Sequence, residues 1–180
     1  MTLDLLPSLV LWGLIATVAM TTILSGSQGL GLSRLSLPFL VGTLFTASRS
    51  RAMIVGFILY VIGGWLFALL YFALFASIDK ASWWLGAALG FLHGLFLLVC
   101  ALPVLAYMHP RMASEHDGPS SDFRLEPPGF LGLNYGRTTP FTTLLAQTVY
   151  GLTLGMFGQI SQRIIDGCGS NTAAERSGKH

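Results

Sequence analysis

The sequence predicts an all-α membrane protein, with four transmembrane helices in a glycine-packed bundle and a short interfacial helix between the first two. Of its 180 residues, 53% are hydrophobic and only 10% are charged, whereas soluble domains carry about 25% charged residues. Residues 5–33, 52–78, 81–110 and 138–162 contain no Asp, Glu, Lys or Arg. Each stretch exceeds the roughly 20 apolar helical residues that cross a bilayer. Glycines recur at four-residue spacing within these stretches, which favours close helix packing.

The first span is predicted at residues 5–24. The residues before it include Asp4 but no Lys or Arg, whereas a secretory signal begins with positive charge. A retained helix is therefore favoured over a cleaved signal, although Ser25-Gly26-Ser27 has the small residues of a cleavage site. Residues 35–46 are apolar but too short to span, so we expect an interfacial segment there. Ser36 is expected to cap it, with Pro38 in its first turn.

The remaining spans are predicted at residues 53–76, 83–108 and 141–160. The short connection between the second and third makes them an antiparallel hairpin. Trp83, Trp84 and Tyr107 lie near the two ends of the third span, where amphipathic rings favour the headgroup level. A loop is expected at 109–139, a single transmembrane domain over 1–166, and a flexible polar tail over 167–180.

Charge indicates the orientation and the kind of partner. With four spans both termini share one side, opposite the two long loops. Six arginines lie in these loops: Arg34, Arg49, Arg51, Arg111, Arg124 and Arg137. Four cations lie on the other side: Lys80, Arg163, Arg176 and Lys179. Because positive charge prefers the cytoplasm, the termini are expected outside. A net charge of +2 without a basic patch argues against nucleic acid, so the expected partners are the lipid bilayer and a homo-oligomer or larger membrane complex.

Glycine spacing predicts which helix faces pack together. Gly86, Gly90 and Gly94 form one stripe on the third span, because a helix turns about 100° per residue. The same arithmetic places His93 and Cys100 near that stripe. On the fourth span Gly151, Gly155 and Gly158 form a second stripe, with Gln147 beside it. Both glycine faces are therefore expected to point into the bundle together with these polar side chains.

Among the Asp, Glu, Lys, Arg and His side chains, His93 is the only one near the middle of any span. Such a residue is a candidate proton relay, metal or haem ligand, or substrate contact. The alternative is a neutral imidazole that joins two helices by a hydrogen bond. Thr17, Tyr60 and Gln147 are the other intramembrane polar candidates. A bis-histidine haem site would require a second chain, because this one has no second mid-membrane histidine.

Two loop regions carry weaker candidates. His109, Glu115, His116 and Asp117 combine imidazole with carboxylate, which suits zinc or another divalent metal, but their spacing matches no helical zinc pattern and a solvated loop is favoured. Arg137, Thr138 and Thr139 precede the fourth span, where a helix start can hold a lipid phosphate. The alternative is an ordered loop that anchors the helix, with Thr139 as N-cap before Pro140.

The chain resembles an uncharacterised family of four-span bacterial inner-membrane proteins. The likeness covers roughly residues 20–157 and rests on SQGLG at 27–31, LP at 37–38, GTLFT at 42–46, RSRA at 49–52, GWLFALLY at 64–71, HGLF at 93–96, HPRM at 109–112 and LEPPGFLGLNYGR at 125–137. The resemblance implies a bacterial inner membrane but brings no activity. It also implies that similar proteins carry histidine at the positions of Tyr60 and Gln147. Of these three positions, only His93 holds a histidine in this chain.

Three functions are compatible with these observations. We favour a small accessory or scaffold subunit that acts through helix packing or lipid contact, without a cofactor. The first alternative is a small transporter or channel-like protein that uses the glycine-lined interior around His93. The second is a metal- or haem-binding membrane protein. No catalytic arrangement is visible, so an enzyme is not favoured.

Overall fold

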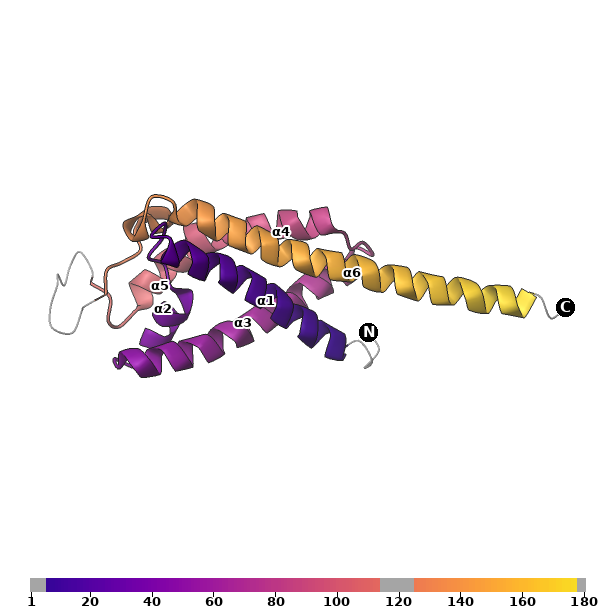
Figure 1. The fold of residues 1–180 in the computed structure, drawn as a ribbon, viewed down its shortest axis with the longest axis horizontal. Coiled ribbons are helices and arrows are strands. Elements are labelled where there is room, and N and C mark those ends of the chain that lie inside the picture. The colour runs from indigo at the N-terminus through magenta and orange to yellow at the C-terminus, as the bar shows by residue number, and fades with distance from the viewer. Residues whose placement is uncertain (1–5, 114–124, 178–180) are drawn as a thin grey trace.

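The computed structural model describes residues 6–113 and 125–177, and within them every regular element is a helix (Figure 1). Three helices are long and apolar enough to cross a membrane: Pro7–Gly29, Arg49–Ser77 and Trp83–Met108. The elements in order are α1 (Leu6–Gly29), α2 (Leu37–Thr43), α3 (Arg49–Ser77), α4 (Trp83–Phe96), η2 (Leu97–Ala101), α5 (Leu102–Met108), η3 (Phe130–Tyr135) and α6 (Thr139–Ser177). The all-helical membrane prediction is therefore supported.

The helices form an elongated bundle (Figure 1). α6 runs alongside α4 and α1, whereas α3 crosses the bundle at an angle and α2 packs on its beginning. α2, α5 and the start of α6 lie at one end, and the N-terminus lies toward the other. Beyond the bundle at that end, α6 projects alone. Large apolar side chains on the outer surface, such as Leu66, Leu70 and Phe96, are more than half exposed, as expected for helices that face lipid.

The first two helices differ in detail from the prediction. α1 continues five residues further, to Gly29, and ends where Gly31 adopts a positive φ of 71° that favours glycine. α2 lies within the predicted interfacial segment and has its proline in the first turn. Ser36 occupies the N-cap position but makes no side-chain capping hydrogen bond, so the expected cap contact is wrong. Its carbonyl instead accepts the backbone N–H of Leu40 at 3.0 Å.

α4, η2 and α5 form one continuous helix with a π-helical segment in the middle. The Leu102 N–H donates to the carbonyl of Leu97, five residues back, and Pro103 follows without an N–H to donate. A π turn holds more residues than an α turn, so it changes which side chains face the bundle. Cys100, expected on the glycine face, is exposed. That expectation is wrong because it assumed an uninterrupted α-helix.

α6 begins at Thr139 and continues to Ser177, well past the predicted end of the span near residue 160 and into the expected polar tail. The prediction ended the span where the apolar residues become fewer after Ile160, but the helix continues past that point. Thr139 was expected to cap this helix through its side chain. Its hydroxyl instead hydrogen-bonds the Ser33 hydroxyl at 2.8 Å, while the Thr138 carbonyl accepts the Thr142 N–H at 3.0 Å.

Glycines lie where α4 and α6 approach most closely. A Cβ atom added at Gly86 would collide with the carbonyl oxygen of Gly151, and one added at Gly151 would collide with that of Gly86. A Cβ at Gly90 would meet the carbonyl oxygen of Gln147. The two backbones are therefore in direct contact. Buried apolar and aromatic side chains of α1, α3 and α6 pack beside this contact: Ala16, Met20, Leu24, Ala68, Tyr71, Phe75, Ala146, Tyr150 and Leu154.

Candidate functional site

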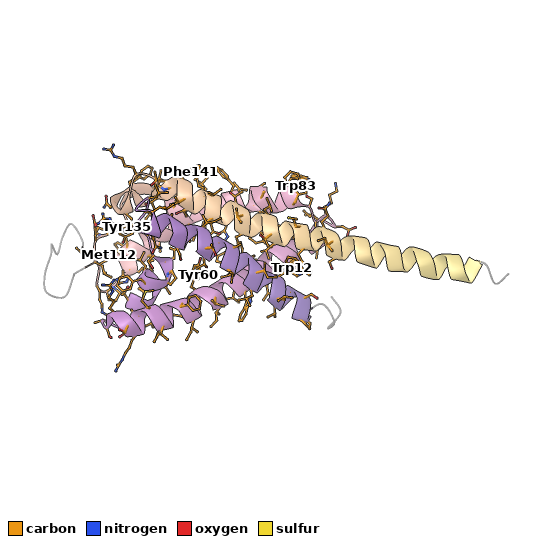
Figure 2. All side chains as sticks on the ribbon, viewed as in Figure 1. Trp12, Tyr60, Trp83, Met112, Tyr135 and Phe141 are labelled. Atoms are coloured by element: carbon orange, nitrogen blue, oxygen red, sulfur yellow. The ribbon has the colours of Figure 1, made fainter. Side chains whose placement is uncertain are left out.

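A cavity of about 290 Å³ lies between α3 and the α4–η2–α5 helix, and residues of α1, α2 and α6 complete its wall. Most of the wall is apolar, with Val41, Leu97 and Leu105 among its side chains. Its polar members come from three different helices: Tyr60 of α3, His93 of α4, and Gln147 and Tyr150 of α6. Figure 2 shows Tyr60 in the angle between α3 and α1. Among the described residues, no Asp, Glu, Lys or Arg lines this wall.

His93 is the ionisable group of this pocket. Its Nδ1 lies 3.4 Å from the Tyr71 hydroxyl, and its ring lies over Phe67 with centroids 4.1 Å apart. Its Nε2 atom is buried and has no hydrogen-bond partner. One imidazole nitrogen is thus positioned by the protein, and the other is unused.

Gln147 is 3% exposed, and its Oε1 atom also lacks a hydrogen-bond partner. The residue is held tightly, because a Cβ added at Gly94 would lie 3.1 Å from the Gln147 Cβ. The Tyr60 hydroxyl interacts with Thr21 but makes no hydrogen bond of ordinary geometry. The Thr21 hydroxyl itself donates to the Thr17 carbonyl at 2.6 Å.

Two tyrosines hold the aromatic side of the pocket in place. The Tyr150 hydroxyl donates to the Gly64 carbonyl at 2.5 Å, which joins α6 to α3. Tyr71 and Tyr150 pack edge to face with ring centroids 5.7 Å apart. The sequence interpretation did not single out Phe67, Tyr71 or Tyr150. A signal existed, because Tyr60, Phe67 and Tyr71 are spaced by seven and four residues and so share one face of α3.

Thr17 does not belong to this group. Its hydroxyl donates to the Gly13 carbonyl at 2.8 Å, and its side chain fills the space that a Cβ on Gly64 would need. Thr17 therefore closes the contact between α1 and α3. Of the four predicted intramembrane candidates, the structure brings three together at one cavity.

Unpartnered buried polar atoms determine what the pocket can bind. Leaving such an atom without a hydrogen bond costs about 1–3 kcal/mol, so a ligand that pairs with Gln147 Oε1 and His93 Nε2 recovers that free energy. A wall without charged residues disfavours a charged ligand, whose desolvation nothing would offset. The volume is near the lower end of small-molecule sites, which hold roughly 300–1,000 Å³. The arrangement suits a small, neutral, mainly apolar molecule.

The wall contributed by α2 is fixed from outside the spans by two residues that follow α5. The Arg111 guanidinium donates to the carbonyls of Thr43 and Leu44 at 2.5 and 3.2 Å, at the end of α2. His109, 4% exposed, places Nε2 3.1 Å from the Thr43 hydroxyl and 3.2 Å from the Leu40 carbonyl. Its Nδ1 accepts the Arg111 backbone N–H at 3.1 Å. His109 is thus the neutral tautomer protonated on Nε2.

Burial, with the Arg111 guanidinium as a smaller contribution, holds the pKa of His109 below its ordinary value of 6.5, and the hydrogen bond to Leu40 opposes this only in part. The structure thus gives His109 a role in positioning α2 and leaves neither ring nitrogen free for a metal. Glu115, His116 and Asp117, its predicted companions, lie outside the described residues. Within the described residues, no group of three or more His, Cys, Asp or Glu side chains is placed to hold a metal ion.

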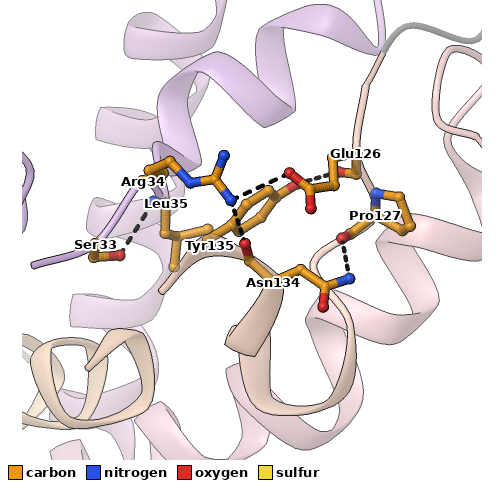
Figure 3. Close-up of polar contacts among 7 residues, drawn as sticks. All are labelled: Ser33, Arg34, Leu35, Glu126, Pro127, Asn134 and Tyr135. Atoms are coloured by element: carbon orange, nitrogen blue, oxygen red, sulfur yellow. Dashed lines mark hydrogen bonds and ion pairs between the residues drawn. The ribbon is translucent and has the colours of Figure 1, made fainter. Parts of the chain in front are cut away.

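The loop before α6 is bound to the α1–α2 connection (Figure 3). Arg34 forms an ion pair with Glu126 at 3.3 Å and donates to the Asn134 carbonyl at 2.5 Å. The Tyr135 hydroxyl donates to the Glu126 carbonyl at 2.6 Å, and the Arg34 N–H donates to the Tyr135 carbonyl at 2.7 Å. Gly129 and Gly132 take positive φ angles of 69° and 72° in this loop, where glycine is favoured.

This loop also shows where the predicted anion-binding residues lie. Arg137 is exposed. The Thr138 hydroxyl donates to the Leu32 carbonyl, and the Thr139 hydroxyl is paired with Ser33. Both hydroxyls therefore connect the start of α6 to the α1–α2 connection.

Comparison with known proteins does not indicate what this site binds. The chain matches no protein-family model, and no curated protein or solved structure shows significant similarity to it. Its function must therefore be argued from the pocket.

Proposed function

We propose that the chain is a four-span membrane protein that binds a small, neutral, mainly apolar molecule from the bilayer in the pocket at His93. The observation that carries this proposal is that three of the four unpartnered buried side-chain polar atoms among the described residues belong to residues that line one apolar cavity: the Tyr60 hydroxyl, His93 Nε2 and Gln147 Oε1. Buried polar groups in folded proteins are nearly always paired. The residues that carry these atoms line a cavity large enough to hold a ligand, and a ligand is the simplest partner for them.

In this proposal the first part of α6 is the fourth span. It lies against α4 through Gly86, Gly90, Gly151 and Gly155, and small residues of this kind are the usual contact between membrane helices. Several of its threonines pair with its own backbone. Thr148 and Thr153, for example, donate to carbonyls four residues back at 2.7 and 2.8 Å. Such bonds satisfy hydroxyls in an apolar surrounding.

The proposed orientation follows the arginines. Arg34, Arg49, Arg51, Arg111 and Arg137 all lie in the linkers or helix termini at the α2 end of the bundle. We assign this end to the cytoplasm by the positive-inside rule, in the bacterial inner membrane that the family resemblance implies. The pocket then opens inside the membrane. An accessory role in a larger assembly is compatible with ligand binding, but no contact within the described chain identifies a protein partner.

The decisive experiment fills the pocket without disturbing the fold. Gly63 lines the cavity, and a Cβ added there meets nothing within 4 Å. Gly63→Leu therefore occupies the cavity, and Gly29→Leu is the matched control, because Gly29 also has open space but does not line the pocket. Each protein is purified in mild detergent, and its lipid extract is analysed by mass spectrometry.

We expect a neutral small molecule at near-stoichiometric amounts with the wild type and with Gly29→Leu, and its loss from Gly63→Leu. Folding of all three is checked by thermal unfolding. An extract that is the same for Gly63→Leu and the wild type would overturn the proposal. So would a wild type that carries only bulk phospholipid.

A further inference from the structure

We infer that the pocket receives the head of a quinone-type lipid, that is, a planar ring with carbonyl or hydroxyl oxygens carried on an apolar tail. This inference rests on the proposed function and names the ligand class. It follows from the hydrogen-bonding capacity, the ring-lined walls and the neutrality of the cavity.

The hydrogen-bonding groups match both redox forms of such a ring. With the Tyr71 hydroxyl donating to His93 Nδ1, the imidazole proton lies on Nε2. Nε2–H and the Tyr60 hydroxyl are then donors without strong acceptors, as carbonyl oxygens of a quinone require. Gln147 Oε1 is an acceptor without a donor, as a quinol hydroxyl requires. A lipid whose only polar group is one hydroxyl does not pair with all three.

The shape of the cavity fits one ring. A cavity of about 150 Å³ holds benzene, so about 290 Å³ admits a substituted single ring and leaves the tail outside. The rings of Phe67 and Tyr150 line the cavity, and aromatic pairs in offset or edge-to-face contact contribute roughly 0.5–1.5 kcal/mol beyond burial. Val41, Leu97 and Leu105 provide aliphatic wall for the start of a tail.

Charge argues against the commoner lipids. In the part of the chain that the structure describes, no Lys or Arg lines the cavity, so neither a fatty-acid carboxylate nor a phospholipid phosphate finds a counter-ion there. A sterol is neutral, but its single hydroxyl would leave two of the three polar groups unpaired. A diacylglycerol carries one hydroxyl and two ester carbonyls, but it has no planar ring to pack against Phe67 and Tyr150. The quinone ring combines the polar oxygens with that ring.

The test uses the full chain in nanodiscs of quinone-free synthetic phospholipid. Decylubiquinone and its reduced form are titrated, and bound quinone is measured by absorbance after the nanodiscs are separated from free ligand. The variants are His93→Phe and Gln147→Met, which keep side-chain volume but remove the polar atoms. Thr148→Val is the matched control, because Thr148 neighbours Gln147 but does not line the cavity.

We expect saturable binding of one quinone per chain. His93→Phe should weaken binding of the oxidised form about tenfold, as loss of one hydrogen bond of roughly 1.4 kcal/mol predicts. Gln147→Met should weaken the reduced form more than the oxidised form. Thr148→Val should stay within about twofold of the wild type, and Gly63→Leu should not bind.

The outcomes separate the inference from the proposed function. If decylubiquinone does not bind but a sterol or diacylglycerol binds and is excluded by Gly63→Leu, the quinone inference is wrong and the proposed function stands. If no neutral lipid binds in a manner sensitive to Gly63→Leu, both are wrong. Quinone binding that is unchanged in folded His93→Phe and Gln147→Met would place the ligand elsewhere and overturn the inference.

Discussion

The two sides of α4 are built in opposite ways. Toward α6, the backbones touch, and Gly86 and Gly151 leave no room for a Cβ atom. Toward α3, the helices stand apart and enclose a cavity of about 290 Å³. α3 is held instead by local contacts, such as the Tyr150 hydroxyl on the Gly64 carbonyl. One side of α4 therefore provides rigidity, and the other provides space.

Glycine serves both sides, for opposite reasons. At Gly151 the missing side chain allows contact, whereas at Gly63 it leaves a cavity open. Gly63 and Gly64 are adjacent in the sequence, yet only Gly64 is closely packed, against Thr17. A glycine in a membrane helix therefore indicates close packing only when its face is known.

The largest effect is expected from inserting a side chain into the backbone contact between α4 and α6. Gly151→Leu places a Cβ against the Gly86 carbonyl and 2.8 Å from the Gly90 Cα. Because backbone cannot move aside as a flexible side chain can, we expect a loss of at least about 3 kcal/mol in the free energy of unfolding, the upper end for overpacking. Unfolding in mixed micelles with increasing denaturing detergent measures it.

Gly63→Leu is the corresponding substitution on the cavity side of α4. It adds the same side chain where space is open, so the free energy of unfolding should change by less than about 1 kcal/mol, and replacing a helical glycine contributes a small gain. Equal losses in Gly151→Leu and Gly63→Leu would show that the two sides of α4 do not differ as described.

Much of the fold could be predicted from the sequence, because its strongest signals are local. Long uncharged stretches predicted the α1, α3 and α4–α5 helices, and the segment too short to span predicted α2. The π turn at Leu97–Ala101 could not be predicted, since no residue within it demands that turn, and it moved Cys100 outward. The continuation of α6 past Ile160 was missed because hydropathy reports burial and not helix formation.

The pocket was predicted only in part. Helical spacing placed His93 and Gln147 on inward faces, but it could not show that their Nε2 and Oε1 atoms lack partners. That depends on the angle at which α3 crosses the bundle. Arg111 was predicted only as a loop charge, because its two acceptors are carbonyls of α2, and backbone acceptors leave no pattern in a sequence.

The next largest effect is expected at α2, which forms part of the wall of the cavity between α3 and α4. Arg111→Ala removes the two hydrogen bonds to the carbonyls of Thr43 and Leu44. Hydrogen bonds to charged groups contribute about 1.5–3 kcal/mol, so α2 should open more often, and the exchange of its backbone amides with deuterium should become faster. Exposed Arg137 provides the control, since Arg137→Ala should leave α2 exchange unchanged. Unchanged exchange in Arg111→Ala would mean that the Arg111 hydrogen bonds do not hold α2 and that His109 and the packing on α3 suffice.

A smaller effect is expected from pH through His109. Since the native state holds its pKa below 6.5, the unfolded chain binds the proton more strongly, and stability should fall as the pH drops from about 7 through 6.5 toward the lower native value. Protonation of Nδ1 also removes its acceptor role toward the Arg111 N–H. We expect His109→Gln to show a shallower loss between pH 7.5 and 5.5 when free energies of unfolding are compared. Parallel curves for the two proteins would assign the pH dependence to other groups.

The smallest effect is expected at the loop that caps the closely packed side. The Arg34–Glu126 ion pair has side chains 68% and 51% exposed, and exposed pairs contribute about 0–1 kcal/mol, so Glu126→Gln should be nearly neutral. Tyr135 is buried, and its hydroxyl donates to the Glu126 carbonyl. Burial and the nearby Glu126 raise the pKa of Tyr135 to about 12, which keeps that donor protonated. Tyr135→Phe should therefore cost more, about 1 kcal/mol. Thermal unfolding of both variants is measured at low and high salt. A loss of stability in Glu126→Gln that is salt-sensitive and larger than in Tyr135→Phe would show that charge, and not the buried hydrogen bond, holds this loop.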